Sequence, residues 1–156
     1  MTTQTPNTPV AAGTIFSAAG LQFLNKLAQN NTRDWFKANQ DEYENTLRTP
    51  ALRFIEQMQP EIIAISPRLT AVAKKVGGSL MRPQRDSRFS KDKTPYKTNV
   101  GIQFRHFQGK DVHAPGLYLH IAEDGCFIAA GIWHPESKAL NAIRACIDEN
   151  QKKKKK

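Results

Sequence analysis

The sequence lacks several features that define common classes of protein. No run of about 18 consecutive apolar residues occurs, and this excludes a membrane-spanning helix. The first thirteen residues have neither a cationic start nor an apolar run, so they predict no signal peptide. The chain also contains no glycine-rich phosphate loop and no Gly-x-Ser-x-Gly nucleophile elbow. The common nucleotide-binding and hydrolase classes therefore have no support in the sequence.

Side chains that bind metals or carry redox chemistry are also sparse. The four histidines form no His-x-His or His-Glu-x-x-His pattern, and no tight cluster of carboxylates accompanies them. Cys126 and Cys146 are far apart and belong to no Cys-x-x-Cys pattern. We therefore expect no metal and no other cofactor. We expect two small buried thiols, rather than a redox pair, in a protein of the reducing cytoplasm.

The length of 156 residues suits one domain with a substantial core. We predict a disordered segment over residues 1–13, a single domain over residues 14–150, and a lysine tail over residues 151–156. The formal net charge is +9, but five of these charges belong to Lys152–Lys156, which leaves +4 for the rest of the chain. A terminal run of lysines is typically a solvated charge run, so we assign it no function.

The remaining positive charge is concentrated in residues 82–99, which we name the basic loop. From Arg82 to Lys97 it contains six basic and two acidic residues, a net charge of +4. No apolar stripe with a period of two or 3.6 runs through it. Two prolines and several turn-forming side chains predict an ordered loop rather than a flexible tether. Phe89 and Tyr96 are its expected apolar anchors.

Apolar residues before the basic loop repeat with the period of a helix. We predict helices over about residues 18–29, 33–48 and 49–65, with Thr32 as the cap of the second. The third starts with Thr49 as its cap and a proline in its first turn. Pro60 should kink or split it, because proline removes a backbone donor and clashes with the preceding turn.

After the basic loop the apolar period changes to two, which predicts strands. Asp124-Gly125 is the strongest hairpin signal in the chain. If these two residues form the turn, Glu123 pairs with Cys126 and one face of the hairpin becomes apolar. The residues expected on this face, toward the helices, are Leu117, Leu119, Ile121, Ile128, Ala130 and Ile132.

Two further elements complete the predicted fold. A short strand is expected at residues 79–82, before the basic loop. Leu140, Ile143 and Ile147 form the stripe of a last helix that ends at about Glu149. The prediction is thus an α+β domain, in which N-terminal helices pack on a small antiparallel sheet with a β-hairpin and a C-terminal helix follows.

Three motifs carry a resemblance to a known family. The central one runs from Arg85 to Thr98 and reads Arg-Asp-x-Arg-Phe-Ser-Lys-Asp-Lys-Thr-Pro-Tyr-Lys-Thr. The flanking motifs are Asn-Asn-x-Arg-x-Trp-Phe at residues 30–36, and Gly-x-Trp-x-Pro at residues 131–135 with Leu140 and an Ile-Arg pair after it. Together they resemble the bacterial and fungal family known as domain of unknown function 2461, over roughly residues 15–149.

The resemblance places the chain without assigning it an activity, because the family has no established biochemical function. Members of the family usually continue well beyond the position of Gln151, so the resemblance implies that this chain is truncated at its C-terminus. We then expect an apolar surface that the missing part would cover, and self-association through that surface. It also allows a site role for Asn30, Asn31 and Trp35. The other interpretation is that these residues cap a loop and pack in the core, where Trp35 and Phe36 anchor the first two helices.

The basic loop allows two interpretations of its own. It is either an oxyanion site, or a structural or protein-interaction loop whose acids pair internally with its arginines and lysines. In the first case, arginine forks and lysine charges bind phosphate or carboxylate, and the acids orient the cations or act as a general base. The partner is then a phosphate-bearing small ligand or nucleic acid, with no membrane partner. The predicted ligand-binding residues are Arg85, Asp86, Arg88, Lys91, Lys93, Tyr96, Lys97, Tyr118 and Trp133. No catalytic nucleophile is identified, so the sequence decides neither for nor against an enzyme.

Overall fold

The computed structural model describes residues 15–107, 115–133 and 135–154. The elements in chain order are α1 (Ala18–Gln29), α2 (Arg33–Ala38), α3 (Gln40–Tyr43), the π-helix η1 (Glu44–Arg48), α4 (Thr49–Ile65), β1 (Leu69–Thr70), β2 (Val100–His106), β3 (Gly116–Ala122), β4 (Gly125–Gly131) and α5 (Ser137–Lys154). The strands form one antiparallel sheet in the order β1-β2-β3-β4. This confirms the α+β class. The predicted disordered segment 1–13 lies outside the described residues.

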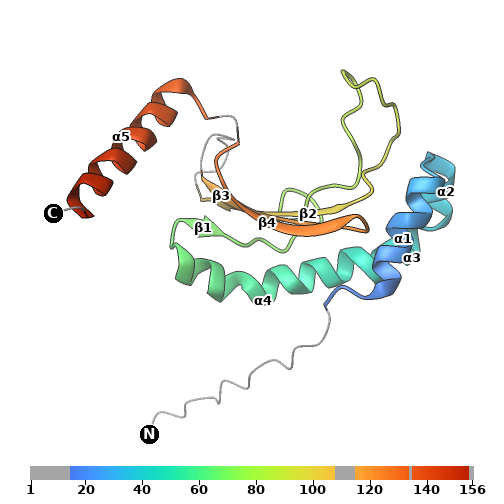
Figure 1. The fold of residues 1–156 in the computed structure, drawn as a ribbon. Coiled ribbons are helices and arrows are strands. Elements are labelled where there is room, and N and C mark those ends of the chain that lie inside the picture. Colours follow the sequence, from blue (N-terminus) through green and yellow to red (C-terminus); the bar gives the residue numbers. More distant parts are fainter. Residues whose placement is uncertain (1–14, 108–114, 134, 155–156) are drawn as a thin grey trace, which may run out of the picture.

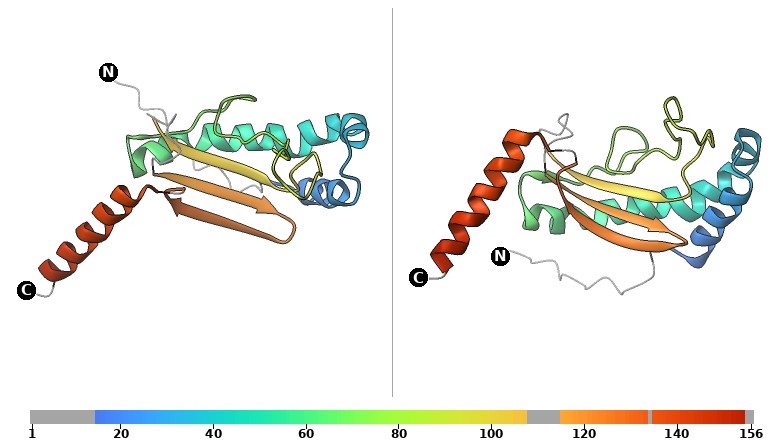
Figure 2. Two further views of the ribbon diagram at one scale, coloured as in Figure 1. Left: turned by 90° about the horizontal axis from the view of Figure 1, so that it is seen from above. Right: turned by 45° about the horizontal axis from the view of Figure 1, so that its top comes forward.

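The elements form two layers. α4 runs along one face of the sheet, and α1 to α3 gather at one end of it (Figure 1). The basic loop rises on the opposite side of the sheet from α4, and α5 projects away from the body (Figures 1 and 2). Within the described residues, no helix combines the length and the apolar character that crossing a membrane requires.

The helices differ from the prediction at two points. The predicted helix 33–48 is divided, because Asn39 leaves the helical conformation and its side-chain Nδ2 donates to the carbonyl of Trp35 at 2.8 Å. Thr49 is not a cap, since Arg48 and Thr49 are both helical and η1 continues directly into α4. A widened π-turn before Pro50 relieves the clash that a proline ring makes with the preceding turn of an α-helix. Pro60 lies inside α4 and does not split it.

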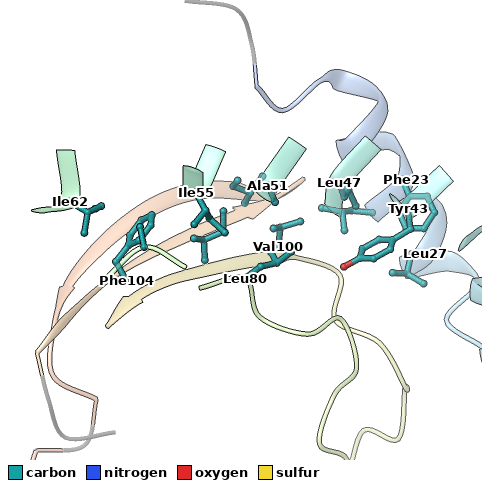
Figure 3. Packing of buried hydrophobic residues seen from close by; sticks show 14 of the residues in the cluster. Phe23, Leu27, Tyr43, Leu47, Ala51, Ile55, Ile62, Leu80, Val100 and Phe104 are labelled. Carbon is teal, nitrogen blue, oxygen red and sulfur yellow. The ribbon is translucent and has the colours of Figure 1, made fainter. Parts of the chain in front are cut away.

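The core lies between α4, the N-terminal helices and β2 (Figure 3). Val100, Ile102 and Phe104 are 6, 0 and 4% exposed, which confirms the alternation predicted for this strand. At the end formed by the helices, the ring of Phe23 lies 5.6 Å from that of Trp35 and 6.3 Å from that of Phe36. The two aromatic residues therefore anchor α2 to α1, as predicted.

The segment before the basic loop is not the predicted strand. Residues 79–82 contribute only an isolated bridge between Leu80 and Ile102, and the short strand of the sheet is β1, which pairs with the end of β2. Ser79 explains why the segment still follows the sheet. Its hydroxyl accepts from Val72 N at 3.0 Å, and its carbonyl accepts from Gln103 N at 2.8 Å.

The hairpin turn forms one residue earlier than predicted, which shifts the pairing of its two strands by two residues. Ala122 pairs with Gly125, so the turn residues are Glu123 and Asp124 rather than Asp124 and Gly125. Glu123 in the turn accepts a hydrogen bond from Asn25 of α1, which ties this turn to the helices. Because side chains alternate with a period of two, the slip changes every partner and moves no residue to the other face.

The apolar face of the hairpin is only partly covered. Ile121 is buried and Leu117 and Leu119 pack against the core, but Ile128 on β4 is 77% exposed and Ala130 is exposed as well. Ile128 and Ala130 pair with Leu119 and Leu117, so they lie on the face turned toward the helices, as predicted. They stay exposed because α4 covers the other strands of the sheet (Figure 2). On α5, Ile143 and Ile147 are 40 and 51% exposed, so its stripe is not packed into the core.

The two cysteines also differ from expectation. Both thiols are free, and both Cys126 and Cys146 are exposed rather than buried. Cys126 lies on β4 and Cys146 on α5, which are the two elements that the core does not cover. The prediction of buried thiols assumed that these elements pack into the core, and they do not.

Candidate functional site

The basic loop is built as a short antiparallel ladder that carries an irregular tip. Arg85 N donates to the carbonyl of Pro95 at 2.9 Å, and Lys97 N donates to the carbonyl of Pro83 at 2.8 Å. Gln84 and Tyr96 form the bridge between these two bonds. The ladder sets Arg85 and Lys97 at the base of the loop, next to the sheet.

Tyr96 attaches this ladder to the helices. Its ring stacks on that of Phe36 with a centroid distance of 4.0 Å and an interplanar angle of 11°. The side chain of Asn31 holds its backbone, because Nδ2 donates to the carbonyl of Tyr96 and Oδ1 accepts from its N–H, both at 3.0 Å. Tyr96 is thus an apolar anchor, as predicted, whereas Phe89 is 95% exposed at the tip and is not one. Of the two roles considered for Asn31, these bonds match the structural one, in which it holds a loop.

Several cations of the tip have internal partners. Arg88 binds Asp86 through two bonds, Nε to Oδ1 at 2.9 Å and Nη2 to Oδ2 at 2.7 Å. This hydrogen-bonded pair lowers the pKa of the Asp86 carboxyl to about 2. Arg85 Nη1 forms an ion pair with Asp92 and also donates to Thr94 Oγ1 at 2.7 Å. Lys93 Nζ donates to the carbonyls of Ser87 and Arg88 at 3.0 and 3.4 Å.

The base of the loop and the sheet border a shallow, open cleft of about 310 Å³. Tyr118 and His120 in its lining pair with Gln103 and Gly101, so they lie on the face of the sheet opposite the core. The basic loop rises on this side of the sheet, opposite α4 (Figure 1). The residues that line it are Met81, Arg85, Asp86, Lys97, Asn99, Tyr118 and His120. Of the nine predicted ligand-binding residues, the fold thus brings four together here. These are Arg85, Asp86, Lys97 and Tyr118.

Lys97 is the cation of the cleft without an internal partner. It is partly buried, and its ammonium has no carboxylate within ion-pair distance among the described residues. Burial lowers the pKa of Lys97, and the positive charge of Arg82 lowers it further. Both effects disfavour the charged ammonium, and the negative charge of a bound anion would oppose them.

The floor of the cleft is a small polar network between Asn99, which precedes β2, and two residues of β3. The Tyr118 hydroxyl lies 3.1 Å from His120 Nδ1, and Asn99 Nδ2 lies 3.4 Å from the same nitrogen. Burial raises the pKa of Tyr118, so its hydroxyl stays protonated and able to donate. Gly101 makes room for this ring, because a Cβ there would lie 3.0 Å from the Tyr118 hydroxyl and 2.9 Å from Met81 Sδ.

Residues at the other predicted positions lie outside the cleft lining. Arg88, Lys91 and Lys93 belong to the tip, and Tyr96 is the anchor described above. Trp133 is 72% exposed beyond the end of β4. The predicted set missed Met81, Asn99 and His120. The alternation of β2 could have indicated Asn99, because extending it back by one residue places Asn99 on the face of Gly101.

The described residues contain no set of side chains suited to binding a metal ion. Within the ranges that the structure describes, no group of three or more histidine, cysteine, aspartate or glutamate side chains could hold a metal ion. The donors that line the cleft are a guanidinium, an ammonium, a phenol, an amide and an imidazole, with one carboxylate. This set suits recognition of an oxyanion through charge and hydrogen bonds.

Asp86 is the negative charge in the lining, and its removal gives a direct test of that chemistry. We expect Asp86→Asn to strengthen phosphate binding several-fold, roughly 3- to 10-fold, because a like charge near a bound anion opposes it. Isothermal titration with inorganic phosphate at low salt measures the change. Asp41→Asn, on α3 outside the cleft lining, is the matched control and should leave the affinity nearly unchanged. Weaker binding in Asp86→Asn would show that the carboxylate supports the site.

Fold and cleft together define an α+β domain with a basic loop folded over one face of its sheet. The family model described as conserved hypothetical protein (DUF2461) matches residues 19–156, and the chain belongs to this family. The family resemblance drawn from its sequence motifs is therefore confirmed. Searches of curated proteins and of solved structures found no match.

Proposed function

We propose that this protein binds a small phosphate- or carboxylate-bearing ligand in the cleft between the basic loop and the sheet. The observation that carries the proposal is Lys97, a partly buried ammonium beside Arg82 with no internal counter-ion among the described residues. Partial burial of such a charge costs free energy, which an internal counter-ion would offset. Perturbed cations in a cleft are typical of functional sites.

The neighbouring side chains supply the rest of an oxyanion site. Arg85 uses Nη1 for Asp92 and Thr94, so its fixed fork retains further donors for a ligand. The Tyr118 hydroxyl and the Asn99 amide lie at the cleft floor, within hydrogen-bond distance of His120 Nδ1, and add neutral polar groups. These groups come from the basic loop, which ends at Asn99, and from β3, so a ligand would be held by two elements at once.

A small ligand fits the geometry better than nucleic acid does. Recognition of a strand needs an extended row of cations with aromatic platforms, whereas Arg88 is paired with Asp86 and Lys93 with backbone carbonyls. Arg85 and Lys97 instead converge on one concavity, whose volume lies at the lower end of the range for small-molecule sites. The ligand we favour is therefore compact and anionic.

A second candidate function rests on the ion pairs of the tip. The two-point pair of Arg88 with Asp86 and the pair of Arg85 with Asp92 are what a self-contained structural loop would show. In that case the loop presents a shape for another protein, and the cleft has no ligand. The two functions differ in what they require of Lys97, since only the anion site needs its charge.

The test is a titration with inorganic phosphate. Binding is monitored through changes in the backbone amide and Tyr118 signals in NMR spectra. The five terminal lysines are first replaced by glutamine, because they bind polyanions without specificity. We expect saturable shifts in Lys97, Asn99 and Tyr118, with an affinity that falls steeply between about 10 and 200 mM salt as charges are screened. A single-stranded oligonucleotide is titrated in parallel. Tighter binding of the oligonucleotide, with shifts along the tip, would favour nucleic acid, and no binding of either would favour the structural loop.

A further inference from the structure

One edge of the sheet is open. β4 is the last strand in the order β1-β2-β3-β4, and Figure 2 shows it on the outer side of the sheet, away from α4. All seven of its residues are exposed, with Phe127 at 52% and Ile128 at 77%. A long edge strand with unpaired backbone groups is a template for pairing with another strand.

The hydrogen-bond phase of the sheet shows which backbone groups of β4 point outward. On β2, the Gly101 carbonyl and the Gln103 N–H bond to residues 81 and 79 rather than to β3. Ile102, between them, therefore bonds to its β3 partner Leu119, and His120 and Tyr118 bond to Phe127 and Ala129 of β4. The two-residue turn gives the same phase, because the residues that flank such a turn form a bonded pair. The N–H and C=O groups of Cys126, Ile128 and Ala130 are left facing outward.

The side chains of β4 suit pairing with a second copy of themselves. The strand reads Gly-Cys-Phe-Ile-Ala-Ala-Gly and contains no charge and no proline, the two devices that usually protect an edge. An antiparallel pair centred on Ile128 would place Ile128 opposite its own copy. Phe127 would then lie opposite Ala129 and Cys126 opposite Ala130, so that large side chains meet small ones. Each end of the strand is a glycine, which adds no steric barrier.

We propose that the protein forms a two-fold symmetric dimer in which β4 pairs antiparallel with β4 of a second copy, with Ile128 opposite Ile128. The pairing joins two four-stranded sheets into one of eight strands and satisfies the outward groups of Cys126, Ile128 and Ala130. A symmetric contact of this kind closes on itself, so it ends at the dimer. The cleft lies on β2 and β3 and is not part of the pairing, so this proposal is independent of anion binding.

The first test is hydrogen exchange of the 156-residue chain at two concentrations. At about 0.1 mM we expect slow exchange at the amides of Cys126, Ile128 and Ala130, and fast exchange after dilution into the monomer range. The amides of Phe127 and Ala129 should be protected at both concentrations, because they bond to β3. Equal exchange of the outward amides at the two concentrations, or a monomer in sedimentation at about 0.1 mM, would overturn the proposal.

The second test uses charge at the symmetry axis. Ile128→Lys puts two ammonium groups opposite each other and should raise the dimer dissociation constant by about 10-fold or more. Val76→Lys is the matched control, because Val76 is 88% exposed and lies away from β4. Ile128→Glu should also be monomeric, and mixing it with Ile128→Lys should restore a dimer. A mixture that stays monomeric, or a dimer that Ile128→Lys leaves intact, would contradict pairing about Ile128. Circular dichroism of each variant confirms that it is folded.

Discussion

Lys97→Gln is expected to weaken phosphate binding by about 10- to 100-fold, while the protein remains at least as stable as the unmodified chain. The loss corresponds to roughly 1.5 to 3 kcal/mol, the range for a hydrogen bond to a charged group. Stability does not fall, because the ammonium has no internal partner among the described residues and its burial is unfavourable. Isothermal titration with phosphate gives the first quantity, and urea unfolding without phosphate gives the second.

The same residue gives a pH dependence whose sign follows from its lowered pKa. Between that lowered pKa and the ordinary value of 10.5, the unfolded chain binds more protons at Lys97 than the folded chain does. The contribution of Lys97 to the free energy of unfolding therefore rises with pH in this window, and it is unfavourable below it. A bound anion raises the pKa again, so binding in this window takes up a proton.

The control for Lys97 is Lys91→Gln, which removes the same charge from the exposed tip of the same loop. Screening makes a distant exposed charge a weak contributor, so we expect less than about a 3-fold change in affinity. Two results would contradict the proposed site. One is an equal loss in both variants, which would indicate a diffuse charge effect. The other is marked unfolding of Lys97→Gln, which would indicate a structural lysine.

Asn31→Ala is expected to reduce both stability and binding. Its side chain makes two hydrogen bonds to the backbone of Tyr96, and both backbone groups would lose their partner in a partly buried position. We expect the free energy of unfolding to fall by about 1 to 3 kcal/mol. Phosphate affinity should fall as well, because the ladder that Asn31 holds also positions Arg85 and Lys97. Urea unfolding and phosphate titration of the same samples measure the two effects.

The neighbouring residue supplies the control for this experiment. Asn30 donates to the carbonyl of Lys26 at the exposed end of α1, and among the described residues no hydrogen bond joins its side chain to the basic loop. Asn30→Ala should cost about 0.5 to 1 kcal/mol, the usual effect of one exposed hydrogen bond, with unchanged phosphate affinity. If Asn31→Ala retained full affinity despite lower stability, the attachment of the loop to the helices would not matter for the cleft.

Local patterns in the sequence were sufficient for much of the fold. The apolar period of 3.6 predicted α1 at its observed bounds, and the period of two predicted the buried face of β2. The density of cations identified the basic loop, and the motif around it indicated the family. These features depend on residues that are close together in the chain, so a single sequence determines them.

Only the tertiary structure decided the register of the hairpin and whether a helix covers the apolar side chains of β4. Shifting the pairs of β3 and β4 by two residues leaves every side chain on its face, so the hydrophobic pattern cannot distinguish the two registers. The observed turn places Glu123 where it meets Asn25, a residue 98 positions away. Ile128 has the apolar character of a core residue, but the position of α4 leaves it uncovered.

The same limit applies to the candidate site. The sequence determined that the loop has more cations than acids, and composition alone could not assign the partners. Folding pairs Arg88 with Asp86 and Arg85 with Asp92, and it sets Lys97 in the cleft beside Tyr118. Which charge stays unpaired depends on distances of a few ångströms between atoms, because ion pairs and desolvation act over that range. Those distances exist only once the loop is folded onto the sheet.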